Sequence, residues 1–447
     1  MIRETDWPMV LIVGGGFGGL SAAKALRDAP VRIAVIDRQN HHVFQPLLYQ
    51  VATASLSPAD ISAPIRAPLK HQKNCDVVLA EVCGVDLKRR KLMLENGVAS
   101  YDYLVLAAGA THAYFGKDHW APLAPGLKSL SDATEIRRRI LLAFESAEHE
   151  ADEKSRRAAL TFVVVGGGPT GVELSGAIME VAAKTIPEEF RNIDTTTTRV
   201  ILVEGSDRIL GAFPPEVSER AKADLERLGV EVRLDARVTD VAEEGVYVGD
   251  AFISAHNVFW AAGVQASPVG KTLGVERDRA GRVKVAPDCS IPGHPEAFVI
   301  GDMATLTCPG DEHPVPGVAQ GAMQMGDYVG EIIAAEVAAK EAAPEREPFR
   351  YRDKGSMAII GKNRAVAVLG SSKFYGFVAW VLWAVVHVFF IIGFRNRTRV
   401  VLGWFYNWMS SSRDARLIVG DATPRIRLPH GPGFEPSLPS SSASSAE

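Results

Sequence analysis

Short apolar runs alternate with glycine-rich turns at the start of the chain. Residues 8–14 form a continuous apolar run of the length expected for a buried strand. A glycine-rich turn follows at residues 14–19, and apolar residues then recur at helical spacing from Leu20. A second apolar run ends at Asp37. The pattern predicts a strand, a helix and a second, parallel strand within about 30 residues.

The same pattern returns in the middle of the chain. Thr161 to Val165 is apolar, residues 166–171 are rich in glycine, and a helical pattern runs from Val172. The next apolar run ends at Glu204. This is the duplication of one supersecondary unit and not a solenoid repeat, because it occurs twice and at a long separation.

Three further apolar runs carry small residues or an acid at their ends. They cover residues 103–110, 258–264 and 297–302, and the last of them ends at Asp302. An alanine-rich helical pattern then continues to Ala343 and stops before Pro344, which we take as the boundary of the final region.

A segment of a different kind lies at residues 374–394. It carries no formal charge, and as a helix of about 21 residues it would be about 31 Å long, enough to cross a bilayer. Three arginines and an aromatic stretch at 404–409 follow it. Its tryptophans, Trp380 and Trp383, lie inside the segment, which fits a spanning helix poorly, whereas the lack of a polar face fits a surface helix poorly. The pattern leaves both arrangements open, and a buried helix or a dimer contact is the third possibility.

Composition excludes several classes of protein. A chain of 447 residues is too long for one ordinary core, and a formal net charge of −4 gives no general attraction to nucleic acid. The four cysteines are far apart and form no CxxC pair, which argues against a disulfide framework or a zinc site and predicts no bound metal. The first ten residues do not have the pattern of a signal peptide.

The two glycine-rich turns carry the first candidate chemistry. A helix N-terminus offers unpaired N–H groups and a positive dipole end to a pyrophosphate. Three glycines in each turn have the GxGxxG spacing: Gly14, Gly16 and Gly19, then Gly166, Gly168 and Gly171. One such motif is a weak signal, but two motifs, each between a strand and a helix and each followed by a strand-terminal acid, predict two dinucleotide sites.

The order of the two sites predicts which cofactor each one holds. By analogy with two-dinucleotide flavoproteins, FAD takes the first site and a nicotinamide the second. Asp37 and Glu204 are placed to accept hydrogen bonds from ribose hydroxyls, and Glu204 favours NADH over NADPH, although nearby Arg208 weakens that preference. Asp302 is expected at the ribityl chain of the flavin, with a simple helix cap as the alternative.

The resulting fold class is α/β, with two Rossmann-like dinucleotide-binding domains and a C-terminal membrane-associated helical region. The expected boundaries are 1–155 and 271–344 for the two parts of the FAD domain, 156–270 for the NADH domain, 345–430 for the membrane-anchoring region, and 431–447 for a disordered tail.

Longer segments make the chain resemble a specific family, the type II NADH dehydrogenases. These are single-subunit NADH:quinone oxidoreductases. The segments are GGGFGG, the run DRQNHHVFQPLLYQVATASLSPADISAPIR, GGGPTGVE, AQGAMQMG at 319–326 and DKGSMAIIGKNRAVA at 353–367. They extend over nearly the whole chain, and the long run after residue 37 is far more specific than a glycine motif.

The resemblance implies roles for three polar residues. Glu173, in the first turn of the second fingerprint helix, matches a carboxylate near the meeting point of nicotinamide, flavin and quinone, for which the resemblance implies a role in proton delivery or in sensing NADH. Gln320 and Gln324 match the glutamines of a quinone segment, and their i, i+4 spacing puts both amides on one helix face. The alternatives are an acid that complements the helix dipole and two solvated glutamines.

The resemblance also implies further cofactor contacts. Pro46 and Thr53 should lie near the flavin ring, and Ala262 and Gly263 near the nicotinamide nucleotide. The other turn and strand-end residues assigned to cofactor binding are Phe17, Gly18, Arg38, Ala108, Gly109, Pro169, Thr170 and Gly301.

The sequence therefore predicts a flavoenzyme that passes hydride from NADH to FAD and two electrons to a quinone, without proton pumping. We expect C-terminal helices on the membrane surface, held by Arg395, Arg397 and Arg399, at the cytoplasmic face of the cell membrane. A homodimer is possible. The alternatives are a sulfide:quinone oxidoreductase, which would need cysteines working at the flavin, and a membrane-bound NADH-sensing or scaffold protein.

Overall fold

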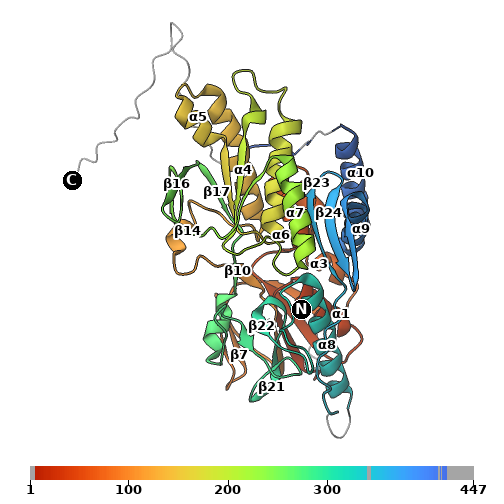
Figure 1. Ribbon diagram of the computed structural model, residues 1–447. Coiled ribbons are helices and arrows are strands. Elements are labelled where there is room, and N and C mark those ends of the chain that lie inside the picture. Colours follow the sequence, from red (N-terminus) through yellow and green to blue (C-terminus); the bar gives the residue numbers. More distant parts are fainter. Residues whose placement is uncertain (1–5, 340–343, 411–412, 414, 420–447) are drawn as a thin grey trace, which may run out of the picture.

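The computed structural model describes residues 6–339, 344–410, 413 and 415–419 of the chain (Figure 1). The expected tail at 431–447 lies outside these residues. Two sheet-centred domains lie one above the other in the view of Figure 1, and the C-terminal helices α9 and α10 cover one side of the upper domain.

The first domain is built on a six-stranded sheet that is parallel except at one edge. The order is β20-β21-β9-β1-β2-β5, and only β20 pairs antiparallel. The strands are Ser290–Ile291, His294–Val299, Tyr103–Leu106, Met9–Val13, Arg32–Asp37 and Cys75–Leu79. Helices α1 (Phe17–Ala25) and α8 (Ala319–Ala338) pack closely together, because a Cβ on Gly326 would lie only 2.2 Å from the carbonyl oxygen of Gly18.

The second domain repeats this plan on a four-stranded parallel sheet, of order β13-β12-β11-β17. The strands are Glu231–Arg233, Arg199–Val203, Thr161–Val165 and Asn257–Trp260. Helices α6 (Pro169–Glu180) and α7 (Pro215–Leu228) belong to this domain, as does the antiparallel sheet of β14 (Val238–Ala242), β15 (Gly245–Val248) and β16 (Ala251–Ser254). Both strand–helix–strand units predicted from the sequence are confirmed.

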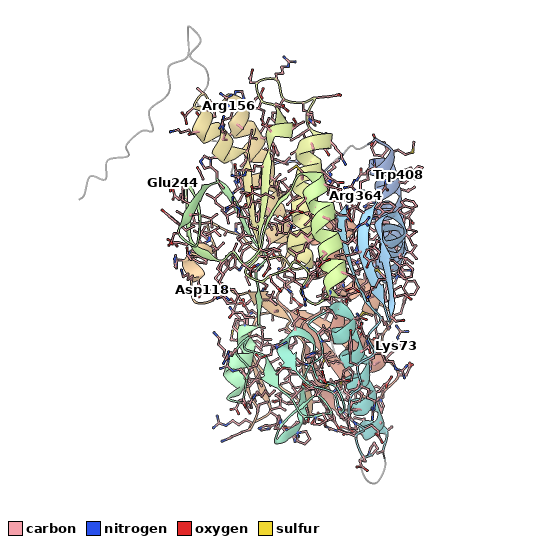
Figure 2. All side chains as sticks on the ribbon, in the orientation of Figure 1. Lys73, Asp118, Arg156, Glu244, Arg364 and Trp408 are labelled. Atoms are coloured by element: carbon pink, nitrogen blue, oxygen red, sulfur yellow. The ribbon has the colours of Figure 1, made fainter. Side chains whose placement is uncertain are left out.

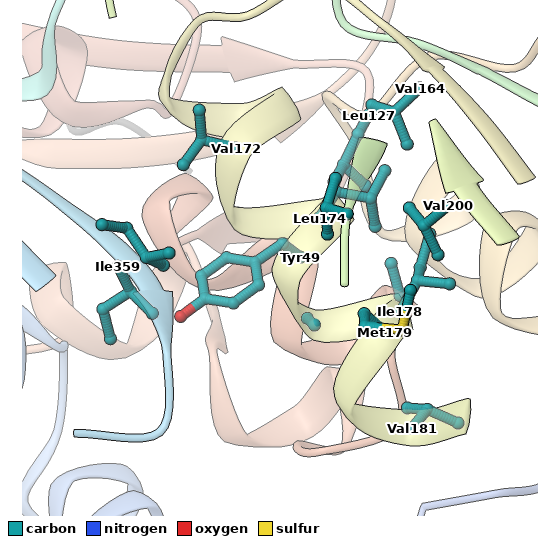
Figure 3. Packing of buried hydrophobic residues seen from close by; sticks show 14 of the residues in the cluster. Tyr49, Leu127, Val164, Val172, Leu174, Ile178, Met179, Val181, Val200 and Ile359 are labelled. Atoms are coloured by element: carbon teal, nitrogen blue, oxygen red, sulfur yellow. The ribbon is translucent and has the colours of Figure 1, made fainter. Parts of the chain in front are cut away.

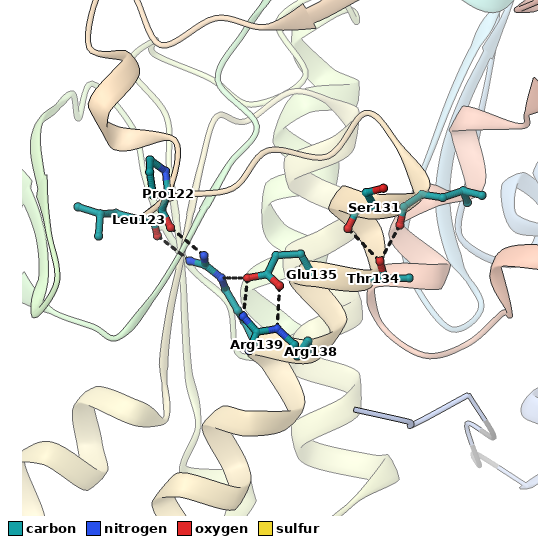
Figure 4. Close-up of polar contacts among 8 residues, drawn as sticks. Pro122, Leu123, Ser131, Thr134, Glu135, Arg138 and Arg139 are labelled. Carbon is teal, nitrogen blue, oxygen red and sulfur yellow. Dashed lines mark hydrogen bonds and ion pairs between the residues drawn. The ribbon is translucent and has the colours of Figure 1, made fainter. Parts of the chain in front are cut away.

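Two antiparallel strands connect the domains. β10 (Ala110–His112) pairs with β18 (Val264–Ala266), so the chain crosses between domains at adjacent positions. Helix α4 (Leu130–His149) follows the first crossing. Figure 4 shows how it is held: Glu135 accepts hydrogen bonds from Arg138 and Arg139, and Arg139 also donates to the carbonyls of Pro122 and Leu123.

Smaller elements complete the two domains. They are β3 (His41–Val43), α2 (Leu48–Ala52), β4 (Ser62–Pro64), α3 (Arg66–Leu69), β6 (Val82–Asp86), β7 (Lys91–Leu94), β8 (Gly97–Ser100), α5 (Glu153–Ala159), β19 (Val283–Lys284) and β22 (Ala304–Thr305).

The region after Pro344 begins with a sheet and not with a helix. Strands β23 (Ser356–Gly361), β24 (Arg364–Leu369) and β25 (Ser372–Tyr375) form an antiparallel sheet next to α6. Gly176 of α6 permits this approach, because a Cβ there would lie 1.9 Å from the carbonyl oxygen of Ile360. Residues 358–360 and 365–367 are buried in the same core as the second domain.

The prediction of a single long helix at 374–394 is wrong. Its first two residues belong to β25, helix α9 covers Gly376–Phe390, and a separate helix, α10, covers Phe394–Ser410. Gly393 at the break has a φ of +90°, and the side chain of Arg397 donates to the carbonyl of Ile391 at 2.8 Å. Among the described residues, no helix is both long enough and apolar enough to span a membrane.

Candidate active site

The first glycine turn has the shape of a phosphate cradle. A Cβ on Gly14 would lie 2.4 Å from the carbonyl oxygen of Ala107, and one on Gly19 would lie 1.9 Å from that of Gly14. These two glycines therefore serve backbone packing. Gly16 differs, because a Cβ there would meet no protein atom within 4 Å and would fill the open space in front of the helix. The open position is where the pyrophosphate of FAD would fit.

The second turn reproduces these three environments. A Cβ on Gly166 would lie 2.5 Å from the carbonyl carbon of Ala261, one on Gly171 would lie 1.8 Å from the carbonyl oxygen of Gly166, and one on Gly168 would meet nothing within 4 Å. Gly168 also precedes the first residue of α6, and no side chain caps that helix. The residues of both turns thus fit two dinucleotides.

The acid at the end of each second strand reaches back to its glycine turn. Asp37 accepts a hydrogen bond from the N–H of Gly15 at 2.7 Å, and Glu204 accepts one from the N–H of Gly167 at 2.5 Å. A carboxylate has about four lone-pair sites, so each acid can still accept from a ribose hydroxyl. Arg208, which weakened the preference for NADH, donates to the carbonyl of Gly211.

Other residues assigned to the cofactors lie around the first domain. Thr53 is buried, and its hydroxyl donates to the carbonyl of Tyr49. The N–H of Ala108 donates to the sulfur of Met303. Asp302 does not cap a helix with its side chain; it forms an ion pair with Lys128 at 3.6 Å, a partner that the sequence did not indicate. The roles of these residues towards FAD remain predictions.

Glu173 is a buried carboxyl on the face of α6 that meets β23. It is the fifth residue of the helix, so its expected placement in the first turn is wrong. The N–H of Ile359 donates to it at 3.4 Å. Burial raises the pKa of Glu173 from its ordinary value of 4.5 to about 8. A carboxyl that holds its proton near neutral pH can act as an acid or a base there.

Gln320 and Gln324 lie on one face of α8, as their spacing predicted. Both amides pair with the backbone of residues 352–355. Gln324 donates to the carbonyl of Arg352 and accepts from its N–H, at 3.0 and 2.9 Å. Gln320 donates to the carbonyl of Gly355 and accepts from the N–H of Lys354, both at 3.1 Å. The two glutamines are therefore held in place and not freely solvated.

One stretch of backbone links these two parts of the site. Residues 352–355 contact the glutamines of α8. Strand β23 follows directly and brings Ile359 to Glu173, and Lys362, the first residue after β23, donates to Glu180. Glu180 also pairs with the buried side chain of Arg413 at 3.3 Å. Glu180 and Arg413 could not be predicted from the sequence, because nothing in the local pattern distinguishes them from surface charges.

A cavity of about 120 Å³, the aromatic cavity, lies between α6 and the C-terminal helices. Glu173, Ala177 and Glu180 line it from α6, and four tryptophans line it from α9 and α10: Trp380, Trp383, Trp404 and Trp408. Tyr49 and Gln50 also contribute. Lys184 and Trp408 are exposed, whereas Tyr49 and Trp383 are buried, so the cavity leads from the surface to a buried end. Figure 2 shows Trp408 at the outer edge of α10. Gln320 and Gln324 do not line it.

Comparison with known proteins places this site in a family. Residues 8–326 match the family model of pyridine nucleotide-disulphide oxidoreductases, and residues 354–414 match that of the NDH2 C-terminal domain. The chain is 45% identical over 433 residues to the type II NADH:quinone oxidoreductase Ndh of Mycobacterium tuberculosis, covering 94% of this chain and 92% of the relative. The chain belongs to the type II NADH:quinone oxidoreductases.

Further similarities agree with this family. A second type II NADH:quinone oxidoreductase of M. tuberculosis, NdhA, is 45% identical over 418 residues, which is 90% of this chain and 88% of the relative. The solved structure of NDH2 from Plasmodium falciparum in complex with NADH has the same fold, with a TM-score of 0.83 at 19% identity, covering 91% of this chain and 99% of that one.

Two of the four free cysteines belong to the core of the first domain. Cys289 and Cys308 are buried, and burial raises the pKa of both thiols. A thiol with a raised pKa is a poor nucleophile. Neither residue lines the aromatic cavity.

Proposed function

We propose that this chain oxidises NADH and reduces a membrane quinone by means of bound FAD. The observation that carries the proposal is the pair of matching glycine cradles, each open at its middle glycine, in a type II NADH:quinone oxidoreductase. Bound FAD supplies the redox chemistry, accepting a hydride equivalent from NADH and returning two electrons to the quinone. The protein supplies alignment, proton handling and exclusion of water.

We further propose that Glu173 holds and releases a proton at the buried end of the cavity. Its raised pKa, which burial causes, leaves it largely protonated at neutral pH. We assign Gln320 and Gln324, which lie outside that cavity, a hydrogen-bonding role towards the quinone at a separate position. Each amide uses one N–H and one lone pair on the 352–355 backbone, so each keeps one N–H for a quinone oxygen.

The function is tested by anaerobic stopped-flow mixing of the FAD-loaded enzyme with NADH. Rapid loss of flavin absorbance, followed by its return on addition of a ubiquinone or menaquinone analogue, is the expected result. Faster bleaching by sulfide than by NADH would favour a sulfide:quinone oxidoreductase. Slow bleaching by NADH would instead favour a sensing or scaffold role.

We propose that α9 and α10 dock on the surface of an anionic membrane at the cytoplasmic face. Both helices present large apolar side chains to solvent, a pattern typical of an interaction surface. The exposed ones are Phe377, Val378, Val381, Val385 and Phe389 on α9, and Val401, Leu402, Phe405, Tyr406, Trp408 and Met409 on α10. Arg395, Arg397 and Arg399 lie at the start of α10, and this charge favours anionic lipid headgroups over a second copy of the chain as the occupant.

Surface substitutions test this docking better than truncation after Pro344, because residues 358–360 and 365–367 are part of the core. Val385→Ser with Leu402→Ser should weaken binding to anionic vesicles at least tenfold, since burial of each side chain contributes about 1.5–3 kcal/mol. Vesicle flotation measures the effect.

A matched control is available elsewhere on the surface. Val98 and Leu79 are 61% and 63% exposed, against 63% and 62% for Val385 and Leu402, and they lie on β8 and β5. Val98→Ser with Leu79→Ser should leave flotation unchanged. Equal loss in both pairs would contradict the assigned face, and conversion of a dimer to a monomer by the first pair would assign it to a second copy.

A further inference from the structure

Tyr49 and Gln50 join the buried end of the aromatic cavity to the C-terminal helices. Both side chains are buried, at 5% and 7% exposure, and both line the cavity. Figure 3 shows the Tyr49 ring between α6 and Ile359, with its hydroxyl directed towards the strand that carries Ile359. Trp404 of α10, more than 350 residues later in the chain, reaches Gln50.

The direction of each hydrogen bond follows from the donor capacity of the indole. The N–H of Trp404 can only donate, and it lies 2.7 Å from Oε1 of Gln50. The amide is thereby fixed in one orientation, and Nε2 of Gln50 donates to the hydroxyl oxygen of Tyr49 at 2.9 Å. Because Tyr49 accepts this bond, its own proton must point elsewhere.

The remaining direction for that proton is the cavity. Among the described residues, Gln50 is the one hydrogen-bond partner of the Tyr49 hydroxyl. Glu173 lies close enough to act on Tyr49 electrostatically, and burial together with Glu173 raises the pKa of Tyr49 well above 10. The phenol therefore keeps its proton throughout the physiological range and serves as a hydrogen-bond donor.

We propose that the Tyr49 hydroxyl, oriented by Gln50 and Trp404, donates a hydrogen bond to a carbonyl oxygen of the quinone within the aromatic cavity. This assignment rests on the proposed function. A quinone carbonyl can only accept hydrogen bonds, and the flat tryptophan rings that line the cavity suit its planar head group. Gln50 and Trp404 are positioning residues, through which the membrane-facing helix α10 sets the direction of a donor at the buried end.

Three substitutions separate this role from packing. Tyr49→Phe removes the donor and keeps the ring. Gln50→Glu keeps the shape but places a carboxylate, which only accepts, against the hydroxyl, so the Tyr49 proton turns away from the cavity. Trp404→Phe frees the amide to rotate. Each should raise the KM for a short-chain ubiquinone about three- to tenfold, the value of one lost hydrogen bond.

The rate of flavin reduction by NADH separates the two explanations. A folding defect would lower this rate, whereas loss of a hydrogen bond to the quinone would leave it unchanged. It should stay at the wild-type value in all three variants, and so should turnover with ferricyanide. Tyr101→Phe is the matched control, because Tyr101 is 4% exposed and lies outside the cavity. Its KM for quinone should be unchanged.

Two outcomes would overturn the proposal in distinguishable ways. A wild-type enzyme that passes electrons from NADH to ferricyanide but to no quinone refutes the proposed function and the Tyr49 assignment with it. If the wild-type enzyme reduces quinone, and Tyr49→Phe and Gln50→Glu have the same KM for quinone as the wild type, the Tyr49 assignment alone is refuted.

Discussion

Gly168→Ala is expected to raise the KM for NADH about 10- to 100-fold while the protein keeps its bound FAD. Gly168 has φ of −70° and ψ of 178°, an extended conformation that alanine adopts without strain. Its added methyl group would contact no protein atom within 4 Å. The cost therefore falls on the ligand, whose pyrophosphate loses its close approach to the backbone at the start of α6.

The equivalent change in the first turn provides the control. Gly16 has φ of −76° and the same open surroundings, so Gly16→Ala should fold but lose FAD. FAD content is measured by absorbance after gel filtration, and the KM for NADH by steady-state turnover with ferricyanide. If Gly168→Ala lost FAD instead, the assignment of the two cofactors to the two turns would be reversed.

Glu173→Gln is expected to lower quinone turnover about 100-fold and to stabilise the protein at alkaline pH. The pKa of Glu173 is about 8 in the folded protein against 4.5 for the ordinary carboxyl, because it is buried. Below pH 4.5 the carboxyl is protonated in both states. Between pH 4.5 and 8 only the unfolded chain loses the proton, so the free energy of unfolding falls as pH rises, by at most about 5 kcal/mol.

Glutamine does not ionise in this pH range, so the free energy of unfolding of the variant does not fall in this way. Its Tm should match the wild type near pH 4.5, exceed it increasingly up to pH 8, and keep a constant advantage above that. Glu180→Gln is the contrast, because it removes the partner of buried Arg413 and should lower the Tm. A Tm difference for Glu173→Gln that does not change with pH would show that the carboxyl is not held protonated. Loss of wild-type quinone turnover above pH 8, absent in the variant, is the matching kinetic result.

The apolar segment at 374–394 shows where sequence patterns mislead. A run without charge indicates burial in protein or lipid, but it does not show where a helix starts or stops. Phe374 and Tyr375 became strand because they pair with Ala367 and Val366 of β24. The helix ended at Phe390, Gly393 turns the backbone three residues later, and the Arg397 side chain donates to the carbonyl of Ile391, the residue that follows the helix. Both sets of contacts involve residues outside the segment.

The predicted site residues show the same difference between local and long-range contacts. The glycine turns and their acids could be predicted because a strand, a turn and a helix are formed by neighbours in sequence. The environment of Glu173 could not be predicted, because its pKa depends on Ile359 of β23, a strand that can approach α6 only because residue 176 is a glycine. The ties between Gln50 and Trp404 and between Thr53 and Arg413 join positions more than 350 residues apart, and no local pattern reveals them.

The sequence by itself thus determined the two dinucleotide folds, their strand-terminal acids and the family. The tertiary structure decided the protonation of Glu173, the binding of both glutamines to residues 352–355, and the cavity beside Tyr49. The physical reason is the range of the interactions. Backbone geometry at a glycine turn is local, whereas burial, which sets a pKa and encloses a cavity, needs segments that meet only when the chain has folded.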